Sequence, residues 1–356
     1  MYSYQYLVPT KVIFGTGKVK EIGDLLKEKI DAGNILLISD PGEWIEPLLQ
    51  DIRNSLTKAG FKNIAHFNGV SPNPKLSECT RGIEFAKENN ANIFIAIGGG
   101  STMDAAKKIA KDSNADFFIT VPTTAGTGCH INEWSVLTRD DNHEKISVQN
   151  IAANIAILDP AATASMPPVV TLCTGLDSFS HGMEAYFGTG ASTLTDLQAL
   201  KGCQLVVENI ERAMLDGSDL ESRTNMLEAD FLTGSAMINA GLGILHCIAN
   251  IVPGFYPHYS HGYLCGSLLK STAEFNEPAL PDHKREQMIP LVEKAAQILD
   301  ESVQKYNIEP ITIIESDVRP IREIAAVNVN GLTNPRKITE EAVEQVMRST
   351  FNIVQG

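Results

Sequence analysis

The first 160 residues alternate short apolar runs with stretches whose apolar residues recur at helical spacing. The apolar runs predict buried strands at residues 35–39, 63–67, 93–97 and 117–121. Between these runs, apolar positions with charged opposite faces predict helices at residues 19–29, 44–59, 76–89 and 103–111. Strand, helix and strand in succession with short connections predict an open, mostly parallel sheet that is covered on both faces.

From Pro167 onward the strand pattern nearly disappears, and long helical segments follow one another as far as Phe351. Pro168 suits the first turn of a helix, where the missing N–H of proline costs little. The pattern therefore predicts an α/β domain over residues 1–162 followed by an all-helical domain over residues 163–356.

Composition supports two ordinary domains and excludes several kinds of partner. The chain has 356 residues, of which 43% are hydrophobic, enough for substantial cores. Its net charge of −14 is spread without a basic block, which argues against a nucleic-acid partner and an anionic membrane surface. The most apolar stretch, residues 151–173, is interrupted by asparagine, aspartate and prolines, so no spanning helix is expected.

The cysteines and the N-terminus indicate the compartment. None of the six cysteines forms a Cys-x-x-Cys pair, which is typical of reduced, buried thiols. The segment from Met1 to Phe14 has no apolar core and no small-residue cleavage site, so we expect no secretory signal. A cytoplasmic protein is expected.

A glycine-rich segment marks a candidate phosphate site. Gly98-Gly99-Gly100-Ser101 follows the predicted strand at residues 93–97 and precedes a helix that carries Asp104 and Lys107. Glycines allow close backbone approach, and free N–H groups at a helix start attract a diphosphate. A tight turn alone would also use glycine, and the segment is not the common Gly-x-Gly-x-x-Gly fingerprint.

Two further features lie at predicted strand ends, where such sheets bind ligands. The segment from Pro122 to Gly128 offers threonine hydroxyls and flexible backbone, although a plain turn would look similar. Asp40 follows the strand at residues 35–39, where a carboxylate accepts hydrogen bonds from ribose and repels a 2′-phosphate. This arrangement favours NAD over NADP, and a helix N-cap is the alternative role for Asp40.

Four residues of the second half form a candidate metal site. Asp177 and His181 are four residues apart and share one face of a helix, while His246 and His261 stand in glycine-containing segments. One carboxylate and three imidazoles suit Fe²⁺ or Zn²⁺ better than Mg²⁺ or Ca²⁺. Each histidine alone would more often be a packing residue; the four residues together favour a metal.

With these motifs, the sequence resembles the iron-containing, or group III, alcohol dehydrogenase family over almost its whole length. The resemblance rests on Phe14-Gly15-x-Gly17, Pro72-Asn73-Pro74, Gly98-Gly99-Gly100-Ser101-x-x-Asp104-x-x-Lys107, the segment from Pro122 to Gly128, Ile157-Leu158-Asp159-Pro160, Gly175-x-Asp177-x-x-x-His181-x-x-Glu184-Ala185-Tyr186, Gly241-Leu242-Gly243-x-x-His246, His261-Gly262 and Thr333-Asn334-Pro335-Arg336.

The resemblance implies that a dinucleotide binds over the N-terminal sheet and that the metal lies between the domains. It implies metal binding by Asp177, His181, His246 and His261, and interconversion of an alcohol and its carbonyl compound. We expect NAD rather than NADP as cofactor, Fe²⁺ or Zn²⁺ as metal, a polar small-molecule substrate and a homodimer. The expected cofactor-binding residues are Asp40, Gly98, Gly99, Gly100, Ser101, Asp104, Thr123, Thr124, Thr127 and Lys145.

The chain departs from the family pattern at three places. Cys129-His130-Ile131-Asn132 replaces Ser-Glu-Val-Thr, and Asn250 stands where family dehydrogenases carry a second histidine. His258 competes with His261 as the last metal ligand, because the segment before His261 is about one residue longer than usual. An amide does not titrate, so Asn250 is a candidate for holding a polar substrate, and His130 is a candidate proton relay or a packing residue.

These departures leave other functions open. One is specialised oxidation of a sugar acid or polyol with a tightly held nicotinamide, since buried polar groups need partners. A lyase resembling dehydroquinate synthase and a metal-binding protein without turnover are the further alternatives. The motifs quoted above fit alcohol dehydrogenases better than either.

Overall fold

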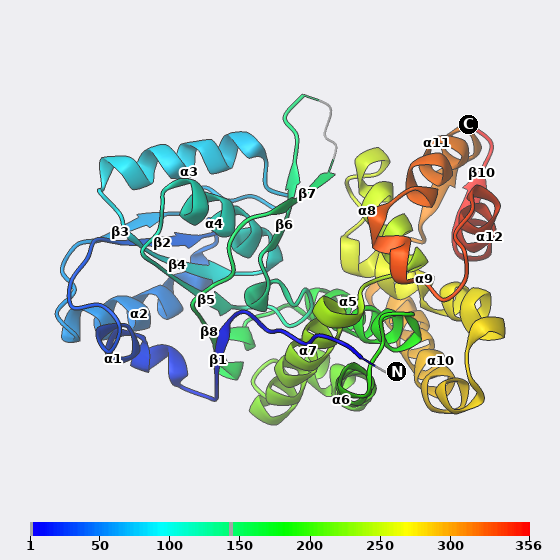
Figure 1. Ribbon diagram of the computed structural model, residues 1–356, viewed down its shortest axis with the longest axis horizontal. Coiled ribbons are helices and arrows are strands. Elements are labelled where there is room, and N and C mark those ends of the chain that lie inside the picture. Colours follow the sequence, from blue (N-terminus) through cyan, green and yellow to red (C-terminus); the bar gives the residue numbers. More distant parts are fainter. Residues whose placement is uncertain (1–2, 142–144) are drawn as a thin grey trace.

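The computed structural model describes residues 3–141 and 145–356, so the first two residues of the segment examined for a signal lie outside it. The sheet-containing half and the helical half lie side by side, and the N-terminal segment runs across to the helical half (Figure 1). There Tyr6 donates a hydrogen bond to Gln198 at 3.0 Å, and the N–H of Leu7 donates to Asn239 at 2.7 Å.

Six parallel strands form the main sheet in the order β1-β8-β5-β4-β2-β3. Its strands are β1 (Lys11–Phe14), β2 (Ile35–Ser39), β3 (Ile64–Phe67), β4 (Ile93–Gly98), β5 (Phe117–Pro122) and β8 (Ile155–Leu158). The structure confirms the four predicted strands and the open parallel sheet. The outer strand β1 and its neighbour β8 were not predicted as strands.

Helices cover both faces of this sheet, as predicted. They are α1 (Ile22–Lys27) and α2 (Glu46–Lys58), with short 3-10 turns before each, and α3 (Leu76–Glu88) and α4 (Gly100–Asp112). Successive strand side chains point to opposite faces. Leu37 and Ile95 therefore pack with α1 and α2, whereas Leu36 and Phe94 pack with α3 and α4.

An antiparallel hairpin that the sequence pattern did not predict projects from this half (Figure 1). It consists of β6 (Trp134–Thr138) and β7 (Lys145–Gln149). The buried Lys107 of α4 anchors it by donating a hydrogen bond to the carbonyl oxygen of Trp134 at 2.6 Å.

The second half is a bundle of helices around one large apolar core. Its helices are α5 (Pro168–Phe187), α6 (Thr193–Leu215), α7 (Leu220–Ala240), α8 (Ile244–Phe255), α9 (His261–Asn276), α10 (Asp282–Tyr306), α11 (Glu315–Ala326) and α12 (Glu340–Thr350). Pro168 occupies the first turn of α5, as predicted. The expectation of an all-helical domain needs one correction, because two short parallel strands, β9 (Thr312–Ile314) and β10 (Asn352–Val354), pair there.

All six cysteines are free and buried, as expected for reduced thiols. Among the described residues, no single helix is long and apolar enough to cross a membrane. The helices α7 and α8 pass that test of length and composition only as a pair, bent by 103°.

Candidate functional site

The glycine segment after β4 and the threonine segment after β5 pack directly against each other. The N–H of Thr123 donates a hydrogen bond to the carbonyl oxygen of Gly98 at 2.9 Å. A Cβ added to Gly100 would lie 2.8 Å from Cγ2 of Thr127, and one on Gly99 would lie 3.1 Å from Cγ2 of Thr124. The missing side chains thus allow two loops to meet at the carboxyl edge of the sheet, where α4 begins.

This edge can present a diphosphate with free backbone N–H groups, because α4 starts at Gly100 and has no side-chain cap. Ser101 accepts a hydrogen bond from the N–H of Asn73 at 3.2 Å, which ties a third loop to the same helix start. The hydroxyl of Thr123 is buried and has no hydrogen-bond partner in the described part of the chain.

Asp104 and Lys107 face the hairpin. Asp104 accepts a hydrogen bond from the N–H of Val136 at 3.0 Å and lies 3.8 Å from the ammonium of Lys107. Burial raises the pKa of Asp104 to about 6, against the opposing effect of Lys107. Asp104 therefore positions β6, and a cofactor contact by this residue stays a prediction.

Lys145 begins β7 of the hairpin. Burial lowers the pKa of Lys145, while Asp104, Cys265 and Asp177 act in the opposite direction. These three acidic groups come from both halves of the molecule. In its protonated form, Lys145 would attract a phosphate, and a cofactor contact by this residue stays a prediction.

Asp40 lies directly after β2 in a surface pocket of about 750 Å³. Gly42, Glu46, His66 and Asn68 line the same pocket. Within the described residues, the Asp40 carboxylate accepts one long hydrogen bond, 3.4 Å, from the N–H of Gly42. Burial raises the pKa of Asp40, and the Gly42 bond opposes that rise. Its carboxylate retains acceptor capacity for ribose hydroxyls.

In the helical half, three imidazoles converge on one carboxylate oxygen. Oδ1 of Asp177 lies 3.7 Å from Nε2 of His181, 3.7 Å from Nε2 of His246 and 3.5 Å from Nε2 of His261. Asp177 and His181 share a face of α5, while His246 lies near the start of α8 and His261 begins α9. The structure therefore brings together all four predicted metal ligands.

The Nδ1 atom of each histidine has its own acceptor, which leaves each Nε2 free to face the centre. His246 donates to Glu184 at 2.7 Å, His181 to the carbonyl oxygen of Gly126 at 3.1 Å and His261 to that of Ala249 at 3.3 Å. Partners of this kind fix the tautomer and the ring orientation of metal-binding histidines. Through Gly126, the threonine segment of the nucleotide edge orients one of these imidazoles.

Glu184 contributes more than sequence reasoning gave it. Its carboxylate also accepts hydrogen bonds from the N–H groups of Gly243, at 2.9 Å, and Leu245, at 2.7 Å. It thus holds the N-terminus of α8, where a negative charge is favourable, together with His246. The i, i+7 spacing from Asp177 indicated in the sequence that Glu184 shares a face of α5 with Asp177, but not which groups it would contact.

The protonation states of the residues around Asp177 suit a bound cation. Burial lowers the pKa of His181 and of His261 to about 4, so both imidazoles are neutral near pH 7. Burial disfavours ionised Asp177, but the surrounding histidines outweigh it and hold its pKa well below the ordinary value. Oδ1 of Asp177 is buried without a hydrogen-bond partner in the described residues, and a metal would satisfy it. Nitrogen and oxygen donors of this kind fit Fe²⁺ or Zn²⁺.

Sequence reasoning overlooked a further donor in the cluster. The ligand atoms of Asp177, His246, His261 and Cys265 all lie within 4.8 Å of one another. Cys265 follows His261 by four residues on α9, so the spacing that identified Asp177 and His181 would also have indicated this pair.

The structure favours His261 over His258. His258 is exposed, and its ring lies 4.0 Å from that of Tyr259, whereas His261 faces Asp177. The longer segment between α8 and α9 therefore accommodates an additional surface histidine and does not shift the metal-facing residue.

The residues that depart from the family pattern lie in different environments. Asn250 is half-buried on α8, one turn after His246 and on the same face. Asn132 is buried and bonded to Lys107 and to the backbone of Gly128 and Trp134, so its role is structural. His130 is buried 3.7 Å from Asp230, and burial lowers its pKa to about 3, which favours packing over a proton relay.

Comparison with known proteins agrees with this geometry. The model of the family described as iron-containing alcohol dehydrogenase matches residues 9–160, and the model of its C-terminal family matches residues 171–351. Alcohol dehydrogenase 4 of Saccharomyces cerevisiae strain YJM789 is 30% identical over 97% of this chain and 98% of its own length. Choline dehydrogenase of Bacillus subtilis strain 168 is 28% identical over 98% of this chain and 96% of its own length.

Solved structures share the fold. The crystal structure of a 1,3-propanediol oxidoreductase matches with a TM-score of 0.89 and 27% identity, covering 98% of this chain and all of the other. The chain belongs to the iron-containing alcohol dehydrogenase family. The resemblance read from the motifs is therefore confirmed, and the lyase alternative is not favoured.

Membership of this family makes the protein an oxidoreductase. It interconverts a small-molecule alcohol and its carbonyl compound by hydride transfer with a nicotinamide cofactor, and it depends on a divalent metal.

Proposed function

We propose that this dehydrogenase uses NAD, holds its metal with Asp177, His181, His246 and His261, and acts on a polar alcohol. The proposal is supported chiefly by the three Nε2 atoms that surround the unpartnered Oδ1 of Asp177. When bound, a divalent cation supplies Lewis acidity toward an alcohol or carbonyl oxygen, and nicotinamide supplies the hydride acceptor or donor.

Residues of this chain would hold the nicotinamide cofactor and the metal side by side. The N–H groups at the start of α4 bind the diphosphate, supported by Thr123, Thr124 and Thr127 and by the charge of Lys145. Asp40 accepts hydrogen bonds from the adenosine ribose. The hydrogen bond between His181 and the carbonyl oxygen of Gly126 keeps this edge in register with the metal ligands.

Asn250 is the residue that favours a polar substrate. It stands one turn beyond His246 on α8, is half-buried, and offers both donors and an acceptor that do not titrate. A sugar acid or a polyol, with a nicotinamide that stays bound through turnover, is the second candidate. We further propose a cytoplasmic homodimer.

A turnover assay tests the activity. The purified protein, loaded with Fe²⁺ or Zn²⁺, is incubated with NAD and a panel of simple alcohols, polyols and sugar acids while absorbance of reduced nicotinamide is followed. We expect NADH formation that is faster on the polar members. Turnover of substrate without added NAD would identify a retained cofactor, and silence on every member would contradict the proposal.

Elemental analysis tests the ligand set. We expect His246→Ala to lose most of its metal and nearly all turnover, because one of four ligands is removed from a preformed site. The matched control His258→Ala should keep both, since His258 is exposed. Full metal occupancy in His246→Ala, or metal loss in His258→Ala, would overturn the assignment.

A further inference from the structure

Cys265 lies against the proposed metal ligands. It is fully buried on α9, one turn after His261 and on the same helix face. Its Sγ lies 3.5 Å from Nε2 of His261 and 4.0 Å from Nε2 of His246. Both of these nitrogen atoms also face Oδ1 of Asp177. The sulfur therefore lies on the inner side of the cluster.

These separations are compatible with atoms that share one cation, as well as with hydrogen bonds between the thiol and the imidazoles. Zinc binds imidazole nitrogen at about 2.0–2.1 Å and thiolate sulfur at about 2.3 Å, so two such ligands at a tetrahedral angle lie roughly 3.5 Å apart. The sulfur of Cys265 meets this spacing toward His261, at 3.5 Å, and exceeds it by about half an ångström toward His246, at 4.0 Å. The nitrogen-to-oxygen separations around Asp177, 3.5 to 3.7 Å, follow the same rule.

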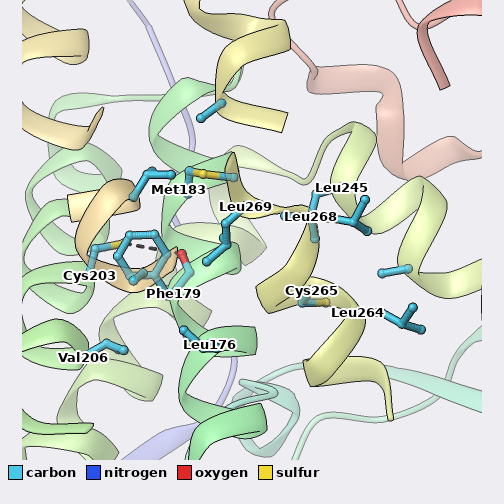
Figure 2. Close-up of a cluster of buried hydrophobic side chains, with 14 of the residues drawn as sticks. Leu176, Phe179, Met183, Cys203, Val206, Leu245, Leu264, Cys265, Leu268 and Leu269 are labelled. Atoms are coloured by element: carbon cyan, nitrogen blue, oxygen red, sulfur yellow. Dashed lines mark hydrogen bonds between the residues drawn. The ribbon is translucent and has the colours of Figure 1, made fainter. Parts of the chain in front are cut away.

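Another buried cysteine shows the ordinary alternative. The side chain of Cys203 packs against Phe179, whose carbonyl oxygen lies 3.4 Å from its sulfur (Figure 2). Cys265 is drawn in the same figure, on α9 and apart from that pair. Cys203 therefore fills apolar space, whereas the sulfur of Cys265 faces the Nε2 atoms of His261 and His246, which also face Oδ1 of Asp177.

We propose that Cys265 is a direct thiolate ligand of the same metal, in one group with Asp177, His246 and His261, an inference that rests on the proposed metal site. When the sulfur–metal bond forms, the S–H bond breaks and its proton passes to water; no atom changes oxidation state. A thiolate among the donors favours Zn²⁺ over Fe²⁺, because sulfur is a softer ligand than nitrogen or oxygen. The protein would thus prefer zinc within a family described as iron-containing.

Cobalt substitution of the full-length protein tests this ligand. Co²⁺ bound to a thiolate gives an intense near-ultraviolet charge-transfer band, and its weaker visible bands report binding by any donor set. We expect the charge-transfer band and the visible bands in the wild type. Cys265→Ser should lose the charge-transfer band and keep the visible bands, since the nitrogen and carboxylate ligands remain. The matched control Cys247→Ser should keep both, because the sulfur of Cys247 lies 3.9 Å from the carbonyl oxygen of Asn328, away from the cluster.

The outcomes separate the two proposals. Failure of the wild type to bind Co²⁺ would overturn the metal site itself. Visible bands without a charge-transfer band, or a band that persists in Cys265→Ser, would overturn Cys265 as ligand and leave the metal site standing. If Cys265→Ser does not fold, X-ray absorption of the zinc-loaded wild type decides, with one sulfur expected at about 2.3 Å from the metal.

Metal competition measures the consequence. With Zn²⁺ and Fe²⁺ offered together under anaerobic conditions, we expect the ratio of bound zinc to bound iron to fall on the order of tenfold in Cys265→Ser, the scale on which changes around a site alter affinity. An unchanged ratio would show that the sulfur does not set metal preference.

Discussion

Asp40 is the residue that we expect to select the cofactor. A lost ribose hydrogen bond or a charge repulsion of about 1–3 kcal/mol corresponds to roughly a five- to hundredfold preference for NAD over NADP. Asp40→Gly should reduce that preference in kcat/KM, while Asp31→Gly, at an exposed bend, should leave it unchanged. Equal efficiency of the wild type with both cofactors would contradict the assignment.

Asn250 is the residue that we expect to select the substrate. Asn250→His should raise activity on propanol and lower it on polar alcohols, because a polar group left unpaired in the site costs about 1–3 kcal/mol. Kinetics of both proteins on propanol and on a sugar-acid panel measure the rate ratios. Identical ratios would mean that Asn250 sets no preference and would remove the main support for a polar substrate.

At the scale of single residues, local spacing predicted part of the cluster and tertiary contacts supplied the rest. The i, i+4 spacing of Asp177 and His181 could be read without a fold. The role of Glu184 could not, because its partners Gly243, Leu245 and His246 are about 60 residues away in the sequence. Cys265 was missed for a different reason, since its spacing from His261 was readable but a lone cysteine was interpreted as packing.

At the scale of elements, the contact between the two loops of the nucleotide edge depends on a missing side chain. In Gly100→Ala the new Cβ would lie 2.8 Å from Cγ2 of Thr127, whose hydroxyl is held by Cys129 at 2.9 Å. The loops must then separate, and we expect NADH to bind on the order of tenfold more weakly, about 1.4 kcal/mol. Fluorescence titration with NADH measures this.

The double variant Gly100→Ala/Thr127→Ser serves as the control for that prediction. Serine lacks the Cγ2 atom but keeps the hydroxyl, so a large part of the affinity should return. If the double variant binds NADH no better than Gly100→Ala, the steric explanation is wrong.

The elements differ in how well the sequence could predict them. Continuous apolar runs such as Ile93–Gly98 indicate strands that are buried on both faces, and the longer runs were predicted, whereas the four-residue buried run of β8 was missed. The four-residue β1 is only half-buried, and the β6–β7 hairpin lies outside the main sheet and alternates its burial. Such short or peripheral strands depend on partners far away in the sequence, which a local pattern does not contain.

At the scale of the whole molecule, a buried aspartate of the helical half contacts the nucleotide edge. Asp230 on α7 accepts a hydrogen bond from the N–H of Gly128 at 2.9 Å. A Cβ on Gly128 would lie 2.8 Å from Cα of Gly234, so α7 and this loop meet through glycine backbone. Together with the bond from His181 to Gly126, this contact joins the two halves beside the metal ligands.

Asp230 also makes the stability of the whole molecule depend on pH. Burial raises its pKa to about 7, and the hydrogen bond from Gly128 opposes that rise. In the unfolded chain the pKa is about 3.9. Below pH 4 both states are protonated, so this group adds no difference between them. Between about pH 4 and pH 7, Asp230 is ionised in the unfolded chain but still protonated in the folded protein. The free energy of unfolding therefore falls as the pH rises through this window.

Asp230→Asn should therefore gain stability over the wild type as the pH rises. Asparagine keeps the carbonyl oxygen that accepts from Gly128 and does not ionise, so we expect near equality at pH 4 and a gain of about 2–4 kcal/mol at pH 8. Urea unfolding of both proteins at the two pH values measures this, with Asp300→Asn, exposed on α10, as the control that should show little change. A gain that is equal at both pH values, or larger at pH 4, would show that Asp230 ionises normally in the folded protein and that the two halves meet around a charged carboxylate.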